Sequence, residues 1–549
     1  MREERPWLRS YPPNVPPTLE PYPVESLFSL LEGSARRFPD QPAIAWFGRR
    51  LSFGEVLRDV ERCSAMLASL GVAKGDRVSL IMPNCPPFVI AFFACQRLGA
   101  IAVGNNPLYT KREMAHQLKD TGPAVVVVAD LMYADFADVF AELGIEQVVV
   151  ARLNDYMPLV KRLLAPVAVL RKQQKAAGKP WPPVPKGARV QRWRAGLKTT
   201  APVPPVATID PKSDVAAFVY TGGTTGVAKG AMLSHANLTA NARQSAAWME
   251  ITQDGQEAVL AAMPFFHSFG MVSMNLAILK AAKLIPVANP RDLHMILELI
   301  DHEKPTLFPG VPRLYISLNE HPQTPSFDLK SLKACISGAA PLPTAVAKEF
   351  ERITGGAQVV EGYGLTECSP VTHANPVHGM RKEGHIGLPI PDTQCRLVSL
   401  EDPDREMGVG EPGELCIKGP QVMLGYWNRP EETALAIRNG WFHTGDVAEM
   451  DEDGYFRIVD RLKDMILVSG FNVYPTEVEE VLYRHPKVLR ACVVGVPDPR
   501  TGEAVKAYLV LRKGETATLE EIRAFCGDPE HGLAAYRMPT QVEFRDALP

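Results

Sequence analysis

The sequence has 549 residues, more than one hydrophobic core usually organises, so we expect two or more domains. Hydrophobic residues make up 46% and charged residues 22% of the chain, which is the composition of a globular protein and excludes a disordered one. The formal net charge of -3 gives no whole-protein attraction to nucleic acid, and no stretch approaches the ~18 apolar residues of a membrane-spanning helix.

The nine cysteines are scattered, with no C-x-x-C pair and no zinc-binding spacing. This pattern indicates reduced thiols, as in the cytosol. Residues Met1–Val24 carry charges and prolines but no apolar h-region, so we expect no signal peptide. The sequence therefore predicts a cytoplasmic protein.

The first 150 residues alternate between helical and extended patterns. A helix is expected at Glu25–Phe38, followed by a hairpin of Ala43–Phe47 and Arg49–Phe53. Short strands and helices then alternate over Arg77–Met82, Pro86–Leu98, Ile101–Val103, Lys111–Asp120, Ala124–Ala129, Met132–Leu143 and Glu146–Val150. This rhythm is typical of a parallel sheet covered by helices on both faces.

Residues 156–200 interrupt the alternation. They contain eleven basic residues and no acidic one, and apolar residues from Tyr156 to Leu170 recur at helical spacing. A basic amphipathic segment of this kind can bind an anionic membrane surface. A solvated basic loop that packs its leucines on the main domain explains the pattern equally well, and Pro158 and Pro166 count against one long helix.

A glycine- and threonine-rich loop follows the expected strand Val215–Tyr220 and precedes a helix expected at Ser234–Glu250. Glycines let the backbone approach a ligand closely, and successive N–H groups, threonine hydroxyls and a lysine bind anions. The alternative interpretation is a flexible surface loop that binds no ligand. We predict a polyphosphate site at the loop, formed by Thr221, Gly222, Gly223, Thr224, Thr225, Gly226 and Lys229.

Two better-known phosphate loops are excluded. A Walker loop ends G-K-[ST], whereas Lys229 stands between Ala228 and Gly230. The dinucleotide fingerprint G-x-G-x-x-G is absent from this loop.

The alternation of strands and helices resumes after this loop and continues to Tyr363. Residues 384–460 then become β-rich, with Gly and Pro turns that predict a small barrel-like subdomain or an extra sheet. A compact βα pattern after Asp460 indicates a separate domain. We therefore predict an α/β protein with a large domain at 1–460 and a smaller α+β domain at 461–549 that is incomplete at its end.

Further polar motifs follow expected strands. Pro264–Gly270 places His267 among aromatic residues, although such a histidine is more often structural. In Glu361–Glu367, Tyr363 has a flat face for adenine and Glu367 is a hard oxygen ligand suited to Mg²⁺.

Near the expected domain boundary, Asp446 can accept hydrogen bonds from both ribose hydroxyls, and Arg461 can donate to the same sugar. Taken alone, each of these residues would be read as part of a surface ion pair.

Taken in order, these motifs resemble the acyl-adenylate-forming enzymes, which include acyl-CoA synthetases, luciferases and peptide-synthetase adenylation domains. The loop motif T-G-G-T-T-G-x-A-K-G-A is most similar to that of the bacterial long-chain fatty-acid–CoA ligases. The resemblance to the family covers about Leu27 to Pro549. It implies that a carboxylate and ATP form acyl-AMP and pyrophosphate, after which CoA displaces AMP.

The resemblance also implies roles for individual residues. The catalytic residues would be His267, Thr224, Lys229 and Glu367, and Glu367 would bind Mg²⁺ with help from Thr221. Adenine, ribose, phosphate or CoA contacts would come from Gly222, Gly223, Thr225, Gly226, Gly338, Ala339, Glu361, Gly362, Tyr363, Thr366, Asp446, Arg461, Lys463 and Gly470. Lys463 would lie at the hinge between the domains.

One departure concerns the end of the sequence. In the family, a lysine in a G-K motif follows shortly after a strand like Gln541–Phe544 and contacts the carboxylate and the α-phosphate during adenylation. No lysine follows Phe544 here, so we expect adenylation to be slowed by about 10²–10³, with ATP or acyl-adenylate binding retained. We also expect the natural protein to continue past Pro549.

Two alternatives to a fatty-acid–CoA ligase stay open. One is a ligase for another carboxylate, either an aryl acid or an acyl group passed to a carrier protein. The other is a non-catalytic protein that binds ATP or an acyl-adenylate. The expected partners are a fatty acid and CoA but no nucleic acid. Peripheral binding to the inner membrane face through 156–200 and a homodimer are further options.

Overall fold

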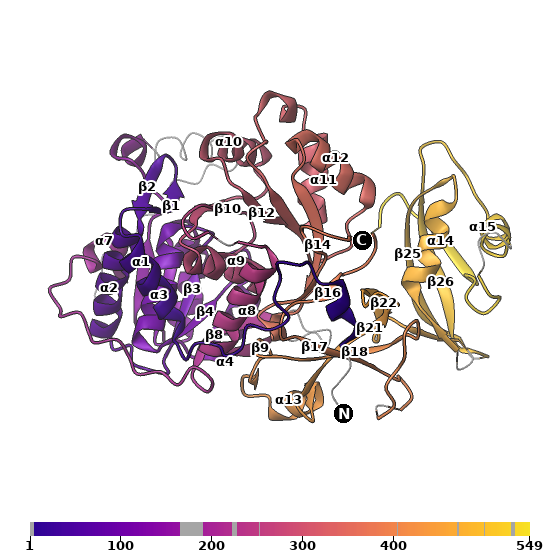
Figure 1. Cartoon of the computed structure of the whole chain (residues 1–549), viewed down its shortest axis with the longest axis horizontal. Coiled ribbons are helices and arrows are strands. Elements are labelled where there is room, and N and C mark those ends of the chain that lie inside the picture. Colours follow the sequence, from indigo (N-terminus) through magenta and orange to yellow (C-terminus); the bar gives the residue numbers. More distant parts are fainter. Residues whose placement is uncertain are drawn as a thin grey trace. The chain divides into compact units, whose positions relative to one another are not determined.

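The computed structural model describes residues 5–164, 190–221, 228–251, 253–402, 404–468, 471–498, 500–528 and 533–548. The chain forms two compact units (Figure 1). Unit 1 comprises Met1–Gln394 and Lys418–Phe442, and unit 2 comprises Cys395–Ile417 and His443–Pro549. Within the described ranges, none of the helices is both long and apolar enough to span a bilayer.

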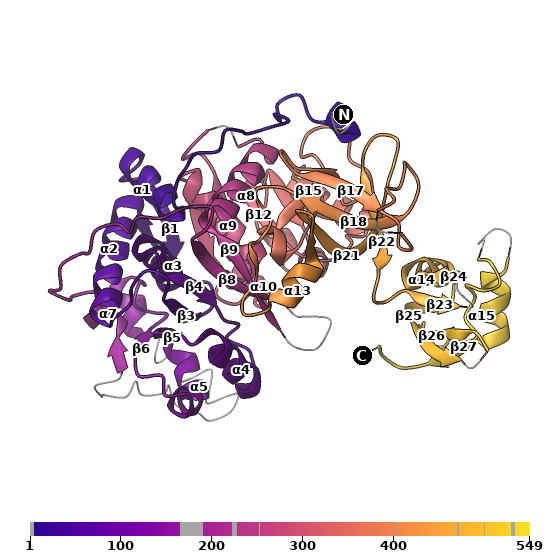
Figure 2. The same ribbon diagram turned by 90° about the horizontal axis from the view of Figure 1, so that it is seen from below.

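The first sheet of unit 1 has eight strands in the order β19-β9-β8-β4-β3-β5-β6-β7 (Figure 2). In this order, each adjacent pair of strands from β8 to β7 is parallel. Strand β9 is antiparallel to both of its neighbours, β8 and β19. The strands are β3 (Arg77–Ile81), β4 (Ile101–Gly104), β5 (Val125–Ala129), β6 (Val148–Ala151), β7 (Val190–Arg192), β8 (Val215–Thr221), β9 (Lys229–Ser234) and β19 (Gly425–Tyr426).

The second sheet of unit 1 has nine strands in the order β16-β15-β14-β13-β12-β10-β11-β1-β2. The neighbours from β14 to β1 are parallel, and the expected hairpin of β1 and β2 is confirmed at one edge. The strands are β1 (Pro42–Trp46), β2 (Arg49–Ser52), β10 (Ala258–Ala261), β11 (Lys283–Pro286), β12 (Leu307–Gly310), β13 (Ala334–Ser337), β14 (Gln358–Gly364), β15 (Val371–Ala374) and β16 (Leu388–Pro389).

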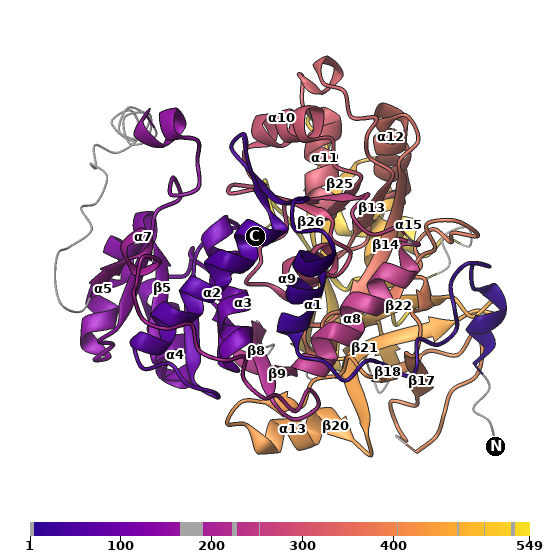
Figure 3. The same ribbon diagram turned by 60° about the vertical axis from the view of Figure 1, so that its left-hand side comes forward.

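Helices cover both faces of these sheets, as the alternation predicted. Helix α8 packs on β8 and β9, α9 packs on β10 and β11, and both pack on α1, so these helices form a layer between the sheets (Figure 3). Helices α4 and α5 cover the other face of the first sheet, and α10, α11 and α12 cover the other face of the second. The helices are α1 (Leu27–Arg37), α2 (Phe53–Ser69), α3 (Pro86–Leu98), α4 (Lys111–Thr121), α5 (Asp130–Glu142), α7 (Trp193–Gly196), α8 (His235–Trp248), α9 (Ser268–Leu279), α10 (Leu293–Glu303), α11 (Pro312–Glu320), α12 (Thr344–Thr354) and α13 (Pro430–Ala436). Short 3-10 helices are η1 (Pro6–Ser10), η2 (Thr324–Ser326) and η3 (Thr366–Cys368).

The burial of α3 and the start of α4 show how the sequence sets this arrangement. Every residue of α3 from Pro86 to Leu98 is buried, which suits a helix that is apolar all round. Helix α4 begins with a capping box in which the Thr110 hydroxyl accepts the Glu113 N–H and the Glu113 carboxylate accepts the Thr110 N–H. These local signals explain why α3 and α4 begin and end close to their predicted bounds.

Unit 2 contains two sheets. In the first, β17 (Gln394–Val398), β18 (Gly413–Lys418), β21 (Trp441–Met450) and β22 (Phe456–Arg461) are neighbours, which confirms that 384–460 is β-rich. The short strand β20 (Ile437–Arg438) pairs with Trp441 and Phe442, all within unit 1.

The second sheet of unit 2 has the order β24-β23-β26-β25, with β27 parallel to β26. Its core includes Val478 and Leu482 of α14 and Ile522 of α15. The elements are β23 (Ile466–Val468), β24 (Phe471–Val473), α14 (Pro475–Arg484), β25 (Val488–Asp498), β26 (Gly502–Leu511), α15 (Leu519–Cys526) and β27 (Gln541–Phe544). Figure 2 shows α14 and α15 with these strands. This is the compact α+β pattern expected at the C-terminal end.

Candidate active site

The glycine- and threonine-rich loop joins two antiparallel strands. Its residues Gly222, Gly223, Thr224, Thr225 and Gly226 lie outside the described residues. The flanking strands β8 and β9 pair with Thr221 opposite Lys229, and helix α8 begins only after β9.

The prediction that the loop leads directly into the helix was therefore wrong, although Ser234 does cap α8. Strand β9 pairs with β8 on one side and with β19 on the other, and Gly425 of β19 lies opposite Met232. Because β19 is remote in the sequence, the local pattern could not reveal this second pairing.

Lys229, Tyr426 and Glu367 form a connected polar cluster near the loop end of this hairpin. The Lys229 ammonium lies 5.3 Å from the centre of the Tyr426 ring. The Tyr426 hydroxyl donates to Oε1 of Glu367 at 2.7 Å. Burial and the negative charge of Glu367 raise the pKa of Tyr426, so the phenol keeps its proton and remains a donor. The cluster therefore combines a cation, a carboxylate and a fixed donor.

The polar cluster is linked to the start of α9. Glu367 lies in η3, and the hydroxyl of its neighbour Thr366 is 3.4 Å from the hydroxyl of Ser268. Ser268 is the first residue of α9. The structure thus brings together the two motifs that contain Glu367 and His267.

His267 caps α9 with its ring. Nδ1 accepts the N–H of Phe269 at 3.2 Å, and surrounding protein atoms lower the pKa of the imidazole through desolvation. The residue is nevertheless accessible to solvent, which indicates a concave part of the surface. A neutral ring whose Nδ1 accepts must carry its proton on Nε2, so His267 presents an N–H donor.

Gly270 explains the tight turn at this point, because a Cβ there would lie 2.0 Å from the carbonyl oxygen of Pro264. Only glycine allows α9 to begin so close to the preceding segment.

Gly338, Ala339 and Gly362 lie at the carboxyl ends of the adjacent strands β13 and β14. A Cβ on Gly338 would be 3.3 Å from the Phe269 ring and 3.5 Å from the Gly362 carbonyl oxygen. Ala339 has φ +70°, a left-handed conformation that is strained for alanine. The three residues therefore form one surface next to the start of α9.

Glu361 and Tyr363 flank Gly362 on β14. Oε1 of Glu361 accepts the N–H of Leu342 at 2.9 Å, and burial raises the pKa of this carboxyl group. Glu361 thereby holds the loop that follows Gly338. The Tyr363 ring meets His373 edge-on, with centroids 5.9 Å apart.

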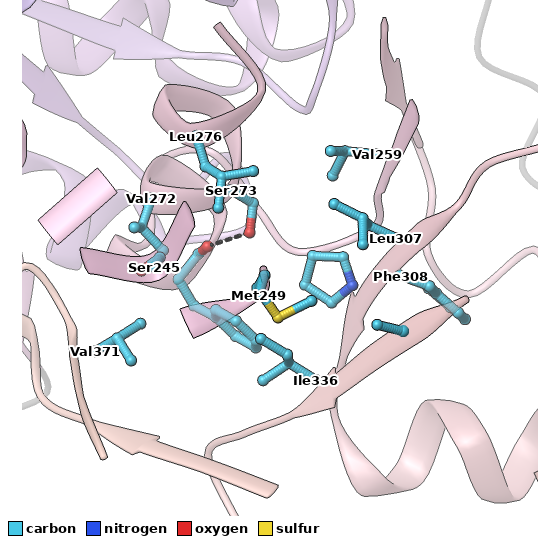
Figure 4. A pocket seen from close by; sticks show the side chains of 13 residues that line it. Ser245, Met249, Val259, Val272, Ser273, Leu276, Leu307, Phe308, Ile336 and Val371 are labelled. Carbon is cyan, nitrogen blue, oxygen red and sulfur yellow. Dashed lines mark hydrogen bonds between the residues drawn. The ribbon is translucent and has the colours of Figure 1, made fainter. Parts of the chain in front are cut away.

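An apolar cavity of about 440 Å³ lies between α8, α9 and the second sheet (Figure 4). Phe269, Val272, Ser273 and Leu276 recur at helical spacing and line it from α9, and Figure 4 shows Val272, Ser273 and Leu276 on this helix. On α9 the lining runs from Phe269, which follows Ser268, to Leu276, about 10 Å along the helix.

Asp446, Arg461 and Lys463 belong to unit 2. Asp446 and Arg461 face each other on β21 and β22, with Nε of Arg461 3.3 Å from Oδ1 of Asp446. The Asp446 side chain is 6% exposed and the Arg461 side chain 57%. Lys463 lies 3.9 Å from Asp464. Gly470 lies outside the described residues.

Two family comparisons cover most of the chain. The AMP-binding enzyme family matches residues 31–427, and the AMP-binding enzyme C-terminal domain matches residues 477–549.

The chain belongs to the AMP-binding enzyme family.

Relatives of this AMP-binding enzyme extend over its whole length. A protein of Bacillus subtilis named long-chain-fatty-acid–CoA ligase is 43% identical over 100% of this chain and 96% of its own. A protein of an Amycolatopsis species named feruloyl-CoA synthase is 36% identical over 94% of each chain. Among solved structures, ATP-bound MatB from Rhodopseudomonas palustris is 30% identical and superposes with a TM-score of 0.79 over 96% of each chain.

Tyr426 is the residue of this AMP-binding enzyme that sequence reasoning missed. It contacts both Lys229 and Glu367. The only local signal is an aromatic pair, Tyr426 and Trp427, directly after Gly425. Its place in the cluster depends on the pairing of β19 with β9.

Proposed function

We propose that this chain converts a long-chain fatty acid, ATP and CoA into acyl-CoA, AMP and pyrophosphate. The observation that carries the proposal is the apolar cavity along α9, whose first lining residue on that helix, Phe269, follows Ser268, and the Ser268 hydroxyl lies 3.4 Å from that of Thr366. The cavity suits an alkyl chain, while the polar cluster suits a nucleotide triphosphate and a carboxylate. The name of the Bacillus subtilis relative supports the same substrate class.

The nucleotide would bind at the loop and at the ends of β13 and β14. Lys229 supplies positive charge for the phosphates, and the hydroxyl of Thr366 adds a donor. The loop residues 222–226 contribute N–H groups. Gly338, Gly362 and the ring of Tyr363 would contact adenine, with Ala339 and Glu361 shaping that surface. In unit 2, Asp446 and Arg461 would hold the ribose.

The residues at the polar cluster fit Mg²⁺. Glu367 offers a carboxylate and Thr221 a hydroxyl, and both are the hard oxygen donors that Mg²⁺ prefers. Thr221 lies opposite Lys229, which in turn lies over the Tyr426 ring that is bonded to Glu367. When bound, Mg²⁺ neutralises phosphate charge.

In the first half-reaction, a carboxylate oxygen attacks the α-phosphorus and pyrophosphate leaves. His267 would donate its Nε2 proton in a hydrogen bond to the carboxylate, and Thr224 and Lys229 would orient the phosphates.

In the second half-reaction, the CoA sulfur attacks the acyl carbonyl carbon and the bond to AMP breaks. We assign this step to residues of the second domain, 461–549, with Lys463 at the hinge and the segment from Gly470 to Glu477 beside CoA. Limited proteolysis tests the boundary, because a hinge at 461–463 should be cleaved before either domain interior.

A mass-spectrometric product screen tests the proposal. Enzyme, ATP, Mg²⁺ and CoA are incubated with a pool of short- to long-chain fatty acids and aryl acids. We expect long-chain acyl-CoA to dominate. If no product forms, synthetic acyl-adenylates replace the acids and ATP. Thioester formed from them would place the defect in adenylation.

A second candidate, a ligase for an aryl acid, is favoured by the name of the Amycolatopsis relative. Dominant aryl-CoA in the same screen would establish it. An enzyme that transfers the acyl group to a carrier protein would give no acyl-CoA but would attach the acyl group to an added carrier protein. A non-catalytic protein would bind ATP tightly and yield no thioester even from acyl-adenylates.

A cytoplasmic location with peripheral membrane binding is also proposed. The described part of 156–200 includes the exposed residues Leu159, Val160, Leu163 and Leu164 beside Lys161 and Arg162. Residues 165–189 lie outside the described residues. Sedimentation with anionic vesicles, but not with neutral ones, would support the proposal, and replacement of Leu163 and Leu164 by serine should weaken it. A homodimer is a separate proposal. Sedimentation velocity of the full chain tests it by measuring the mass of the protein in solution.

A further inference from the structure

A cluster of a carboxylate, a thiol and an imidazole lies in unit 2, on β18 and on the strand β21 that also carries Asp446. Oε2 of Glu414 is 2.8 Å from Nδ1 of His443, and Sγ of Cys416 is 3.3 Å from the same nitrogen. The His443 side chain is 5% exposed and the Glu414 side chain 13%. All three ligand atoms lie within 4.8 Å of one another.

The strands of the first sheet in unit 2 bring these side chains together. Glu414 and Cys416 are two residues apart on β18, so they share one face of the sheet. His443 lies on the neighbouring strand β21. Two adjacent strands thus supply one thiol, one imidazole and one carboxylate.

We propose that Glu414, Cys416 and His443 bind a thiophilic divalent cation, with Zn²⁺ as the best match. Nitrogen and sulfur ligands are those that Zn²⁺ prefers, and a carboxylate is an accepted third. Ligands of one tetrahedral zinc ion, about 2.0–2.3 Å from the metal, lie about 3.3–3.8 Å apart. The separation of 3.3 Å between Cys416 and His443 is within this range.

Hydrogen bonds from neighbouring residues already orient the proposed metal ligands. Oε1 of Glu414 accepts the N–H of Gly445 at 3.2 Å, which fixes the carboxylate so that Oε2 faces His443. The hydroxyl of Thr444 donates to the carbonyl oxygen of Leu415 at 2.7 Å and ties β21 to β18 between the ligands. Such outer contacts typically change metal affinity by about 10–100-fold when removed.

A bound cation would require deprotonation of the Cys416 thiol and of Nδ1 of His443. Binding therefore releases protons and would replace the hydrogen bond between Glu414 and His443 with two metal bonds. Without a metal, the same cluster is a buried hydrogen-bonded pair beside a small thiol. The two states differ in a property that spectroscopy reads directly, the charge-transfer absorption of a metal thiolate.

Cobalt titration of the full chain, stripped of metal with a chelator, tests the proposal. Co²⁺ replaces Zn²⁺ at tetrahedral sites, and its thiolate complexes absorb in the near ultraviolet. We expect one equivalent of Co²⁺ to produce this band and one equivalent of Zn²⁺ to abolish it. Cys416→Ser should eliminate the band, and Glu414→Gln should weaken Co²⁺ binding at least 10-fold.

Cys492→Ser is the matched control, because Cys492 is a half-buried cysteine of unit 2 on β25, a strand of the other sheet. It should leave the titration unchanged. Near-ultraviolet circular dichroism of each variant establishes that it is folded before the titration. The proposal is overturned if the wild type binds Co²⁺ without a thiolate band, if it binds none, or if folded Cys416→Ser keeps the band.

Discussion

Helix α9 lines the apolar cavity, and its first residue, Ser268, lies next to Thr366 beside the polar cluster, yet the cavity and the cluster depend on different kinds of interaction. The cavity is lined by side chains such as Val272 and Leu276, and apolar binding grows gradually with buried area, at about 25 cal/mol per Å². The polar cluster depends on single groups, such as the carboxylate of Glu367 and the hydroxyl of Tyr426. We infer that the cavity can change its substrate in small steps, whereas the polar cluster cannot change without loss of the reaction.

The largest effect should come from Glu367→Gln. Loss of this carboxylate removes the proposed Mg²⁺ ligand, and we expect kcat/KM to fall by about 10³, as for one preorganised charge group. ATP–pyrophosphate exchange at increasing Mg²⁺ measures the loss. Glu349→Gln, at an exposed glutamate of α12, is the control and should be neutral. Activity of Glu367→Gln within threefold of the wild type would remove Glu367 from the site.

A second test uses the histidines that begin the two cavity helices. His235 is the first residue of α8, and burial lowers its pKa to about 4. Between its ordinary pKa of about 6.5 and about 4, the unfolded chain binds a proton that the folded chain does not. The free energy of unfolding should therefore fall as the pH falls through this window, by about 3 kcal/mol at 1.36 kcal/mol per pH unit.

Urea unfolding at pH 7.5 to 4 measures this loss of stability. His235→Gln should flatten the pH dependence, because glutamine does not titrate, whereas His267→Gln should flatten it less because His267 is open to solvent. Equal flattening by both variants would contradict the difference assigned here to burial.

A third test reshapes the cavity alone. Leu276 lies at the end of the cavity far from Ser268, so Leu276→Trp should exclude the end of a long acyl chain. Each excluded methylene costs about 0.8 kcal/mol, or about fourfold in kcat/KM, so loss of two to three methylene contacts lowers activity about 30-fold. Shorter acids should react as before. Leu279→Trp, on the same helix but outside the cavity lining, should leave the chain-length profile unchanged.

The smallest effect is expected for Tyr426→Phe. This change removes only the hydroxyl that donates to Glu367 at 2.7 Å and keeps the ring beneath Lys229. A hydrogen bond to a charged group contributes about 1.5 kcal/mol, so kcat/KM should fall about 10-fold. The chain-length profile should not move. A shifted profile would show that the cavity and the polar cluster are not separable.

Much of the fold could be predicted from local pattern. The helix expected at Pro86–Leu98 matches α3, and the alternation of apolar strands with helices predicted the parallel sheets. Hydrophobic periodicity and caps are local signals, and they determine where an element begins. The same reasoning singled out His267 and Glu367, because each follows a strand within a distinctive motif.

The remainder depends on contacts between distant segments. Strand β9 was read as part of the loop, because its partner β19 lies far away in the sequence. Tyr426 was overlooked for the same reason. The group of Glu414, Cys416 and His443 has no zinc-binding spacing, since its members come from two strands that only the sheet brings together. Sequence motifs find sites within one segment and miss those built across strands.

The pairing of β19 with β9 has a consequence for synthesis on the ribosome. From Ser234 to Gly425 the chain runs a further 191 residues. At roughly 5–20 residues per second, the ribosome needs about 10–40 s to make this stretch. During that interval the hairpin carrying Lys229 has an unpaired edge, which a nascent chain must protect from aggregation.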